Sequence, residues 1–175
     1  MSTFKNEFER QWEVVVSSAV SSIRKAYNEG NTPNMDDVNK VISKSFEKWR
    51  FGNSYENTWF NTIENKNLKA RLLQEVMIIK IVKIKEVYPS KLILLPICVM
   101  FGAILYVSLG YLINIQGWKL YGISIIGTML MWTILSTIQS DKINKKREYY
   151  VNEYKKQLLN YKKQIDIIIN NIDTK

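Results

Sequence analysis

The 175-residue chain contains no histidine and only one cysteine, and these two shortages exclude several classes of chemistry. A single cysteine cannot form a disulfide within the chain, and a Cys/His metal site needs more ligands than one thiol. Without histidine there is no Ser-His or Cys-His nucleophile pair and no histidine-based pH sensor. A glycine-rich phosphate loop is missing too. The sequence therefore predicts a protein that is not an enzyme and has no catalytic, metal or cofactor-binding residues.

The features of a secreted or lipid-anchored protein are also missing. Met1 to Arg10 is polar and charged, without the apolar core of a signal peptide. Position 2 is serine and the chain ends in Asp-Thr-Lys, which match no lipidation motif. The formal net charge is +9, but the basic residues of the N-terminal half are interleaved with acidic ones. We therefore expect no nucleic-acid partner.

Charge itself is nearly absent from Leu92 to Ser140. The one formal charge there is Lys119, beside an expected turn at Gly117-Trp118. The charge-free segments on either side each reach the roughly 20 residues that cross a hydrocarbon core. The sequence therefore predicts an all-α integral membrane protein with a two-span transmembrane hairpin at residues 91–140, its spans at about 92–114 and 118–139.

Basic residues gather at the two outer ends of this hairpin, whereas its turn offers only Lys119. An excess of lysine and arginine marks the cytosolic side, so both termini are expected in the cytosol. The same cations are expected to face anionic lipid, which makes the bilayer the first predicted partner. These flanking residues are Lys80, Lys83, Lys85, Lys91, Lys142, Lys145, Lys146 and Arg147.

Small residues recur inside the hairpin, which contains five of the seven glycines. In lipid, small side chains let helices approach closely enough for dispersion and interhelical hydrogen bonds to hold them. Two interpretations follow. The residues seat one helix of the hairpin on the other, which we favour, or they form a seam between subunits. The predicted packing residues are Cys98, Gly102, Gly110, Gly122, Ser124, Gly127 and Thr128.

Two helices are predicted in the first 51 residues from apolar stripes at helical spacing. The first stripe runs from Phe4 to Tyr27. The second helix is expected to start after Pro33 with the acidic pair Asp36-Asp37 and to end at Phe51. Paired acids at a helix start are more often dipole and cap residues than metal ligands.

A third helix is predicted from Trp59 to Tyr88, ended by Pro89, with an apolar stripe that includes Leu73, Met77 and Ile81. Ile79-Lys80-Ile81, however, alternates like a strand. Three short helices make a thin core, and domains of this size are marginal alone. The cytosolic segment at residues 1–90 is therefore expected to be completed by a protein partner, by another subunit or by the C-terminal helix.

Neither glycine nor proline occurs from Thr128 to Lys175, so the second span is expected to continue into the cytosol as one helix. Its part at residues 141–175 carries a C-terminal stripe, apolar residues at alternating spacings of three and four, typical of about three coiled-coil heptads. Two hypotheses stay open: parallel self-association into a homo-oligomer, or docking on the chain's own N-terminal helices. The stripe consists of Val151, Tyr154, Leu158, Tyr161, Ile165, Ile168 and Ile172.

The layout of two spans followed by a long cytosolic helix resembles two-helix membrane modules proposed as pore-forming effectors in bacterial conflict systems. The resemblance is one of architecture, and the long N-terminal segment departs from it. From the residues, the leading prediction is a non-enzymatic, self-assembling scaffold or interaction module in the bacterial cytoplasmic membrane. A pore-forming or membrane-disrupting effector and a membrane anchor for a cytosolic enzyme are the two alternatives.

Overall fold

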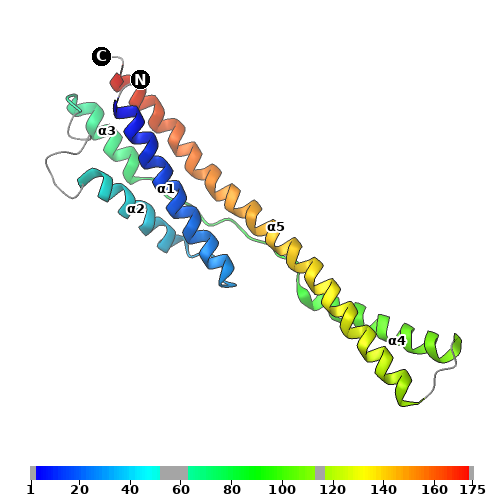
Figure 1. The fold of residues 1–175 in the computed structure, drawn as a ribbon. Coiled ribbons are helices and arrows are strands. Elements are labelled where there is room, and N and C mark those ends of the chain that lie inside the picture. The colour runs from blue at the N-terminus through cyan, green and yellow to red at the C-terminus, as the bar shows by residue number, and fades with distance from the viewer. Residues whose placement is uncertain (1–2, 52–62, 113–116, 174–175) are drawn as a thin grey trace. The chain divides into compact units, whose positions relative to one another are not determined.

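The computed structural model describes residues 3–51, 63–112 and 117–173. Within them every regular element is helical, as predicted, and no strand is present. The elements are α1 (Thr3–Asn28), α2 (Met35–Phe51), α3 (Lys66–Met77), the short 3-10 helix η2 (Lys91–Ile93), α4 (Leu94–Leu112) and α5 (Trp118–Asp173), labelled in Figure 1. The chain forms two compact units, residues 1–85 with 149–175 and residues 86–148, and α5 contributes one part to each.

Helix α1 ends in a Schellman motif built around Gly30. This residue has a φ angle of +79°, a left-handed conformation that costs glycine little. The Gly30 N–H donates to the carbonyl oxygen of Tyr27 at 3.1 Å. The Asn31 N–H donates to the carbonyl oxygen of Ala26 at 2.9 Å, which completes the motif. The apolar stripe that runs to Tyr27 therefore ends with the helix itself.

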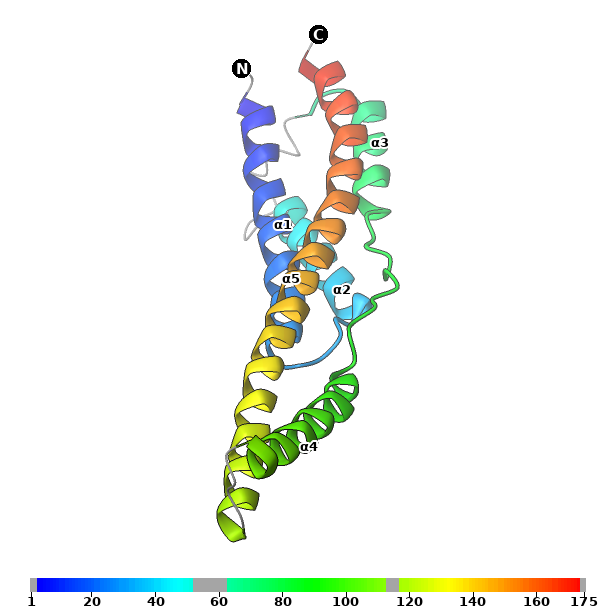
Figure 2. The same ribbon diagram turned by 90° about the vertical axis from the view of Figure 1, so that its right-hand side faces the viewer.

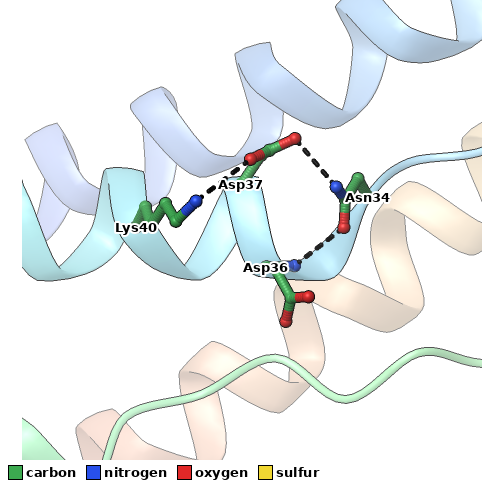
Figure 3. A network of polar contacts seen from close by, with 4 residues as sticks. All are labelled: Asn34, Asp36, Asp37 and Lys40. Atoms are coloured by element: carbon green, nitrogen blue, oxygen red, sulfur yellow. Dashed lines mark hydrogen bonds and ion pairs between the residues drawn. The ribbon is translucent and has the colours of Figure 1, made fainter.

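Helix α2 begins with a polar network that Figure 3 shows. Asn34 Oδ1 accepts a hydrogen bond from the Asp36 N–H at 3.1 Å, and Asn34 Nδ2 donates to Asp37 Oδ2 at 2.9 Å. Lys40 Nζ lies 3.8 Å from Asp37 Oδ1. Two carboxylates in the first turn also complement the positive end of the helix dipole. The acidic pair is thus part of a helix start, and Asn34 is the capping residue that the sequence pattern did not single out.

Helix α3 is much shorter than predicted, because it covers only Lys66–Met77. The prediction of a helix reaching Tyr88 is wrong: the chain continues as the extended connection that precedes α4 in Figure 1. Residues 78–84 contain five β-branched side chains, which are stiff at χ1 and favour extended backbone. The strand-like alternation was the better guide, since Ile79 and Ile81 are both buried. The part of the prediction around Trp59 lies outside the described residues.

The inward face of α3 also differs from the predicted one. Leu72 is fully buried, whereas Met77, which the helical stripe placed inside, is 67% exposed. Because α3 ends at Met77, the apolar side chain in its last turn lies outside the core. The apolar residues after it reach the core from an extended backbone instead.

The first unit packs α1, α2, α3 and the last part of α5 around one apolar core. The Trp12 ring lies 5.9 Å from that of Phe8 and 6.1 Å from that of Phe46, so aromatic rings join α1 to α2. Helices α1 and α5 lie side by side in Figures 1 and 2. The predicted stripes of α1 and α2 supply much of this core, whose buried side chains include Phe8, Trp12, Val15, Ala19, Ile23, Tyr27, Val38, Ile42, Phe46, Leu72, Ile79, Ile81, Tyr154, Leu158 and Ile165.

The second unit consists of η2, α4 and the first part of α5. Gly117 has a φ angle of +70° and accepts a hydrogen bond at its carbonyl oxygen from the Leu120 N–H at 3.1 Å, so the glycine starts α5. From there α5 runs to Asp173 without a break, as the lack of glycine and proline after Thr128 predicted.

Candidate membrane and interaction surfaces

Both long helices of the second unit expose most of their apolar side chains. The segments Lys91–Leu112 and Trp118–Asn170 are long and apolar enough to cross a membrane, and only 6% of the most apolar window of each is buried. Leu92 is 78% exposed, Val107 62% and Leu130 59%. The core helix of a water-soluble protein would be mostly buried, and monomers rarely expose so large an apolar surface. The predicted spans at about 92–114 and 118–139 lie within these segments, apart from positions 113 and 114, which are outside the described residues.

Two glycines lie at contacts between α4 and α5. A Cβ atom added to Gly102 would overlap Oγ1 of Thr128. A Cβ atom added to Gly127 would lie 3.0 Å from Cδ2 of Leu105, which is tighter than an ordinary contact. Gly122 differs, because no such atom lies within 4 Å of the position that its Cβ would occupy. At Gly102 and Gly127 the neighbouring helix therefore leaves little room for a larger side chain, and Gly122 takes no part in these contacts.

The other predicted packing residues also lie in this unit. Cys98 and Ser124 are buried, each less than a tenth exposed. A Cβ atom on Gly110 would lie 3.5 Å from Cδ2 of Leu120, an ordinary van der Waals contact. Apart from Gly122, the predicted packing residues are therefore buried or lie at contacts between α4 and α5 of one chain. The seam between subunits stays a prediction.

Beside this contact, α4 and α5 border an open groove of about 740 Å³. Its lining is almost wholly apolar, and the Ser124 hydroxyl there has no hydrogen-bond partner within the part of the chain that the structure describes. Thr128 Oγ1 donates to the Ser124 carbonyl oxygen at 2.8 Å, and Thr133 Oγ1 donates to that of Leu130 at 2.7 Å. These hydroxyl groups are bonded to their own helix, which gives the groove little polar character.

Residues 78–85, called the strap below, are fixed to the first unit by two side-chain amides. Asn39 Oδ1 accepts from the Ile81 N–H at 2.8 Å, and Asn39 Nδ2 donates to the Ile81 carbonyl oxygen at 3.1 Å. Gln157 makes the same pair of bonds to Val82, at 2.8 and 3.1 Å. Adjacent residues of an extended chain direct their backbone groups to opposite sides, so the strap is held by α2 on one side and by α5 on the other. Neither amide was singled out from the sequence.

The predicted basic residues are mostly exposed where they are described. In the second unit, Lys146 Nζ donates to the Val87 carbonyl oxygen at 3.0 Å. The chain that leads into η2 therefore runs beside α5 just past its apolar segment. Arg147 is half-buried, and the exposed members are Lys80, Lys83, Lys85, Lys91, Lys142, Lys145 and Lys146.

The C-terminal stripe belongs to the core of the first unit. The Tyr154 hydroxyl accepts a hydrogen bond from the Ile84 N–H of the strap at 3.3 Å. Tyr161 is half-buried, and the side chain of Ile172 lies outside the described residues. The stripe thus packs on the chain's own N-terminal segment, as the second of the two hypotheses expected. Its buried members are Val151, Tyr154, Leu158, Ile165 and Ile168.

A second groove, of about 390 Å³, lies between α1 and α5 in the first unit. Val16, Val20 and Leu159 contribute apolar surface. Trp12 also lines the groove, and its buried indole N–H has no hydrogen-bond partner among the described residues. One rim carries an ion pair in which Lys162 Nζ lies 2.6 Å from Glu9 Oε2. The groove therefore combines apolar side chains with charges of both signs.

Next to this ion pair, burial raises the pKa of the Asp166 carboxyl. Lys162 and Lys5 oppose the effect, and Glu9 reinforces it. Asp166 is therefore surrounded by charged groups of both signs. It faces two lysines and one glutamate, so these side chains form a charged network in the first unit, which is called the bundle below.

Among the described residues, no group of three or more histidine, cysteine, aspartate or glutamate side chains is placed to hold a metal ion. Comparison of the chain with protein-family models, with curated proteins and with solved structures found no match.

Proposed function

We propose that this chain is a non-enzymatic, two-span integral membrane protein whose helical bundle acts as a membrane-anchored interaction module. The observation that carries the proposal is the exposure of α4 and of the first part of α5. Both are apolar enough to span a bilayer, and 6% of the most apolar window of each is buried. A bilayer supplies the apolar surroundings that the rest of the chain does not supply.

The distribution of charge supports an orientation with both termini in the cytosol. Lys91 begins the first candidate span, and Lys142, Lys145 and Lys146 follow the apolar part of α5. At the turn end of the two spans the only charge is Lys119, the second residue of α5. Lysine and arginine next to a span favour the cytosolic side, so α4 and α5 would form a hairpin that turns outside.

The bundle is proposed as the interaction module because it forms its own core and still leaves the α1–α5 groove open. The groove combines apolar side chains such as Leu159, 40% exposed, with charges of both signs on its rims. Protein interfaces share this composition, with an apolar centre and a polar edge. A cytosolic protein that inserts apolar side chains there would be held at the membrane.

We do not propose a coiled coil through the C-terminal stripe, since five of its seven residues are buried in the bundle. No specific observation favours a pore either, because the groove beside α4 is apolar and threonine hydroxyls near it bond to their own helix. Self-association stays a prediction.

Cysteine labelling tests the anchor and its orientation together. In a Cys98→Ala background, single cysteines replace Lys119 at the turn or Lys25 in the bundle. A membrane-impermeant maleimide is expected to label Lys119→Cys in intact cells, and Lys25→Cys only after permeabilisation. Alkaline carbonate should leave the chain in the membrane pellet. Release by carbonate would overturn the anchor, and labelling of Lys25→Cys in intact cells would overturn the orientation.

The interaction module is tested by crosslinking in native membranes followed by mass spectrometry. Leu159→Asp places a charge in the α1–α5 groove, whereas Ile167→Asp places one at an exposed position of the same helix outside it. Crosslinks from the groove to another protein should be lost in the first variant and kept in the second. Equal crosslinks in both variants would exclude the groove as the docking site.

A further inference from the structure

The strap and the end of α3 present large apolar side chains to the surroundings. Met77 and Val82 are each 67% exposed, and Ile78 is 51% exposed. Lys80, Lys83 and Lys85 are exposed between and after them. This short segment thus combines three exposed aliphatic side chains with three cations and contains no acidic residue.

Hydrogen bonds to the strap backbone keep Lys80 and Val82 directed outward. Asn39 and Gln157 each make two hydrogen bonds to the strap backbone, and Ile79 and Ile81 are buried beneath it. Side chains on an extended backbone alternate in direction, so burial of Ile79 and Ile81 fixes Lys80 and Val82 on the outer side. The strap therefore presents Val82 to the surroundings in a fixed orientation.

Chain length keeps the strap near the first candidate span. Lys85 precedes Lys91, where that span begins, by six residues. Six extended residues cover at most about 21 Å. The strap therefore cannot lie far from the point where the chain enters the bilayer, whichever way the two units are placed.

We propose that the strap is an interfacial element that binds anionic phospholipid of the cytosolic leaflet, and this inference rests on the proposed membrane anchor. Lys80, Lys83 and Lys85 would pair with the phosphate groups, while Val82 and Ile78 enter the boundary between headgroups and acyl chains. The charge is complementary, because the cytosolic leaflet is negative and attracts basic segments next to a span. Exposed aliphatic side chains beside lysines are also typical of segments that lie in the interface.

Spin labelling of the full chain in nanodiscs tests the contact. Val82→Cys is compared with Val14→Cys, a matched control at an exposed valine of α1, both with Cys98→Ala. The label at position 82 is expected to collide severalfold less often with a water-soluble nickel chelate than the label at position 14. This protection should be stronger in equal parts of phosphatidylcholine and phosphatidylglycerol than in phosphatidylcholine alone.

Charge removal tests the role of the lysines. The triple variant Lys80→Gln, Lys83→Gln and Lys85→Gln should lose the part of the protection that depends on phosphatidylglycerol. A control with the same change of charge on exposed positions elsewhere in the bundle, Lys25→Gln, Lys40→Gln and Lys44→Gln, should keep it. Circular dichroism verifies that both variants fold.

The outcomes separate this inference from the membrane anchor. Release of the chain by carbonate would remove the anchor and the inference together. A chain that stays in the membrane, with a label at position 82 as exposed to nickel as that at position 14, overturns the inference alone. Equal protection in the two nanodiscs, or equal loss in both triple variants, overturns the assignment to anionic lipid.

Discussion

Asn39 of α2 and Ile81 of the strap exchange two hydrogen bonds, as two residues do in a β-sheet. The Asn39 amide takes the place of a neighbouring strand, with distances of 2.8 Å to the Ile81 nitrogen and 3.1 Å to its carbonyl oxygen. Gln157 does the same for Val82 from α5. An extended segment without a sheet partner thus keeps its backbone polar groups satisfied, which buried groups require.

Asn39→Ala should lower the stability of the bundle more than Gln157→Ala. The first change leaves two part-buried backbone groups of Ile81 without a partner, which costs about 1–3 kcal/mol. The groups bonded to Gln157 are exposed, so water replaces the amide and the loss should stay below about 1 kcal/mol. Thermal unfolding in detergent, followed by circular dichroism, measures both. Equal losses would show that burial of the Asn39 pair adds nothing.

The strap shows why the sequence predicted some parts of the fold and missed others. The stripes of α1 and α2 were predictable, because helical spacing of apolar residues reflects one buried face. The end of α3 was not, since Met77 and Ile81 also fit a helical stripe. The end of α3 is set by the β-branched residues that follow it, together with the side-chain amides of Asn39 and Gln157. Asn39 and Gln157 carry no periodic signal, because their role depends on a partner distant in the chain.

Among the candidate membrane and interaction surfaces, too, the sequence predicted some features and left others open. Two charge-free segments marked both apolar helices, since length and composition alone define a candidate span. The spacing of the C-terminal stripe allowed two hypotheses. The helix face that carries Leu158 fits a coiled coil and the core of a helical bundle equally well. Only the folded chain shows which surface covers it.

Gly102→Ala should destabilise the contact between α4 and α5. The added methyl group would overlap Oγ1 of Thr128, and such overpacking costs about 1–3 kcal/mol. The Thr128→Ala change removes that oxygen, so the double variant should recover most of the loss. Gly122→Ala is the matched control, because its methyl group meets open space. Resistance to unfolding in detergent is the measurement, and a loss at Gly122 equal to that at Gly102 would contradict the packing.

Leu158→Ala should unfold part of the bundle, since Leu158 is only 1% exposed. Loss of a buried leucine side chain costs about 2–5 kcal/mol. Ile167→Ala, on the same helix but at a residue 63% exposed, should change stability by less than about 0.5 kcal/mol. Thermal unfolding and light scattering in detergent are measured together. A Leu158→Ala chain with unchanged stability and a smaller oligomer would support the coiled coil instead.

Asp166→Asn should make the bundle slightly more stable at pH 7. Burial raises the pKa of this carboxyl, so the folded chain holds the proton more tightly than the unfolded chain does. The ionised carboxylate therefore costs stability above the folded-state pKa, and the cost disappears as the pH falls below the unfolded value of about 3.9. Since Lys162 and Lys5 offset part of the burial and the side chain is partly exposed, the gain should stay below about 0.5 kcal/mol.

The measurement is the unfolding free energy of parent and variant at pH 7 and below pH 3.9, where both side chains are neutral and the difference should vanish. Asp36→Asn is the control, because this exposed carboxylate lies in the first turn of α2 and favours the helix dipole. Its loss should lower stability at pH 7, opposite in sign to Asp166→Asn. A loss of stability in Asp166→Asn at pH 7 would mean that Lys162 and Lys5 outweigh burial around the carboxylate.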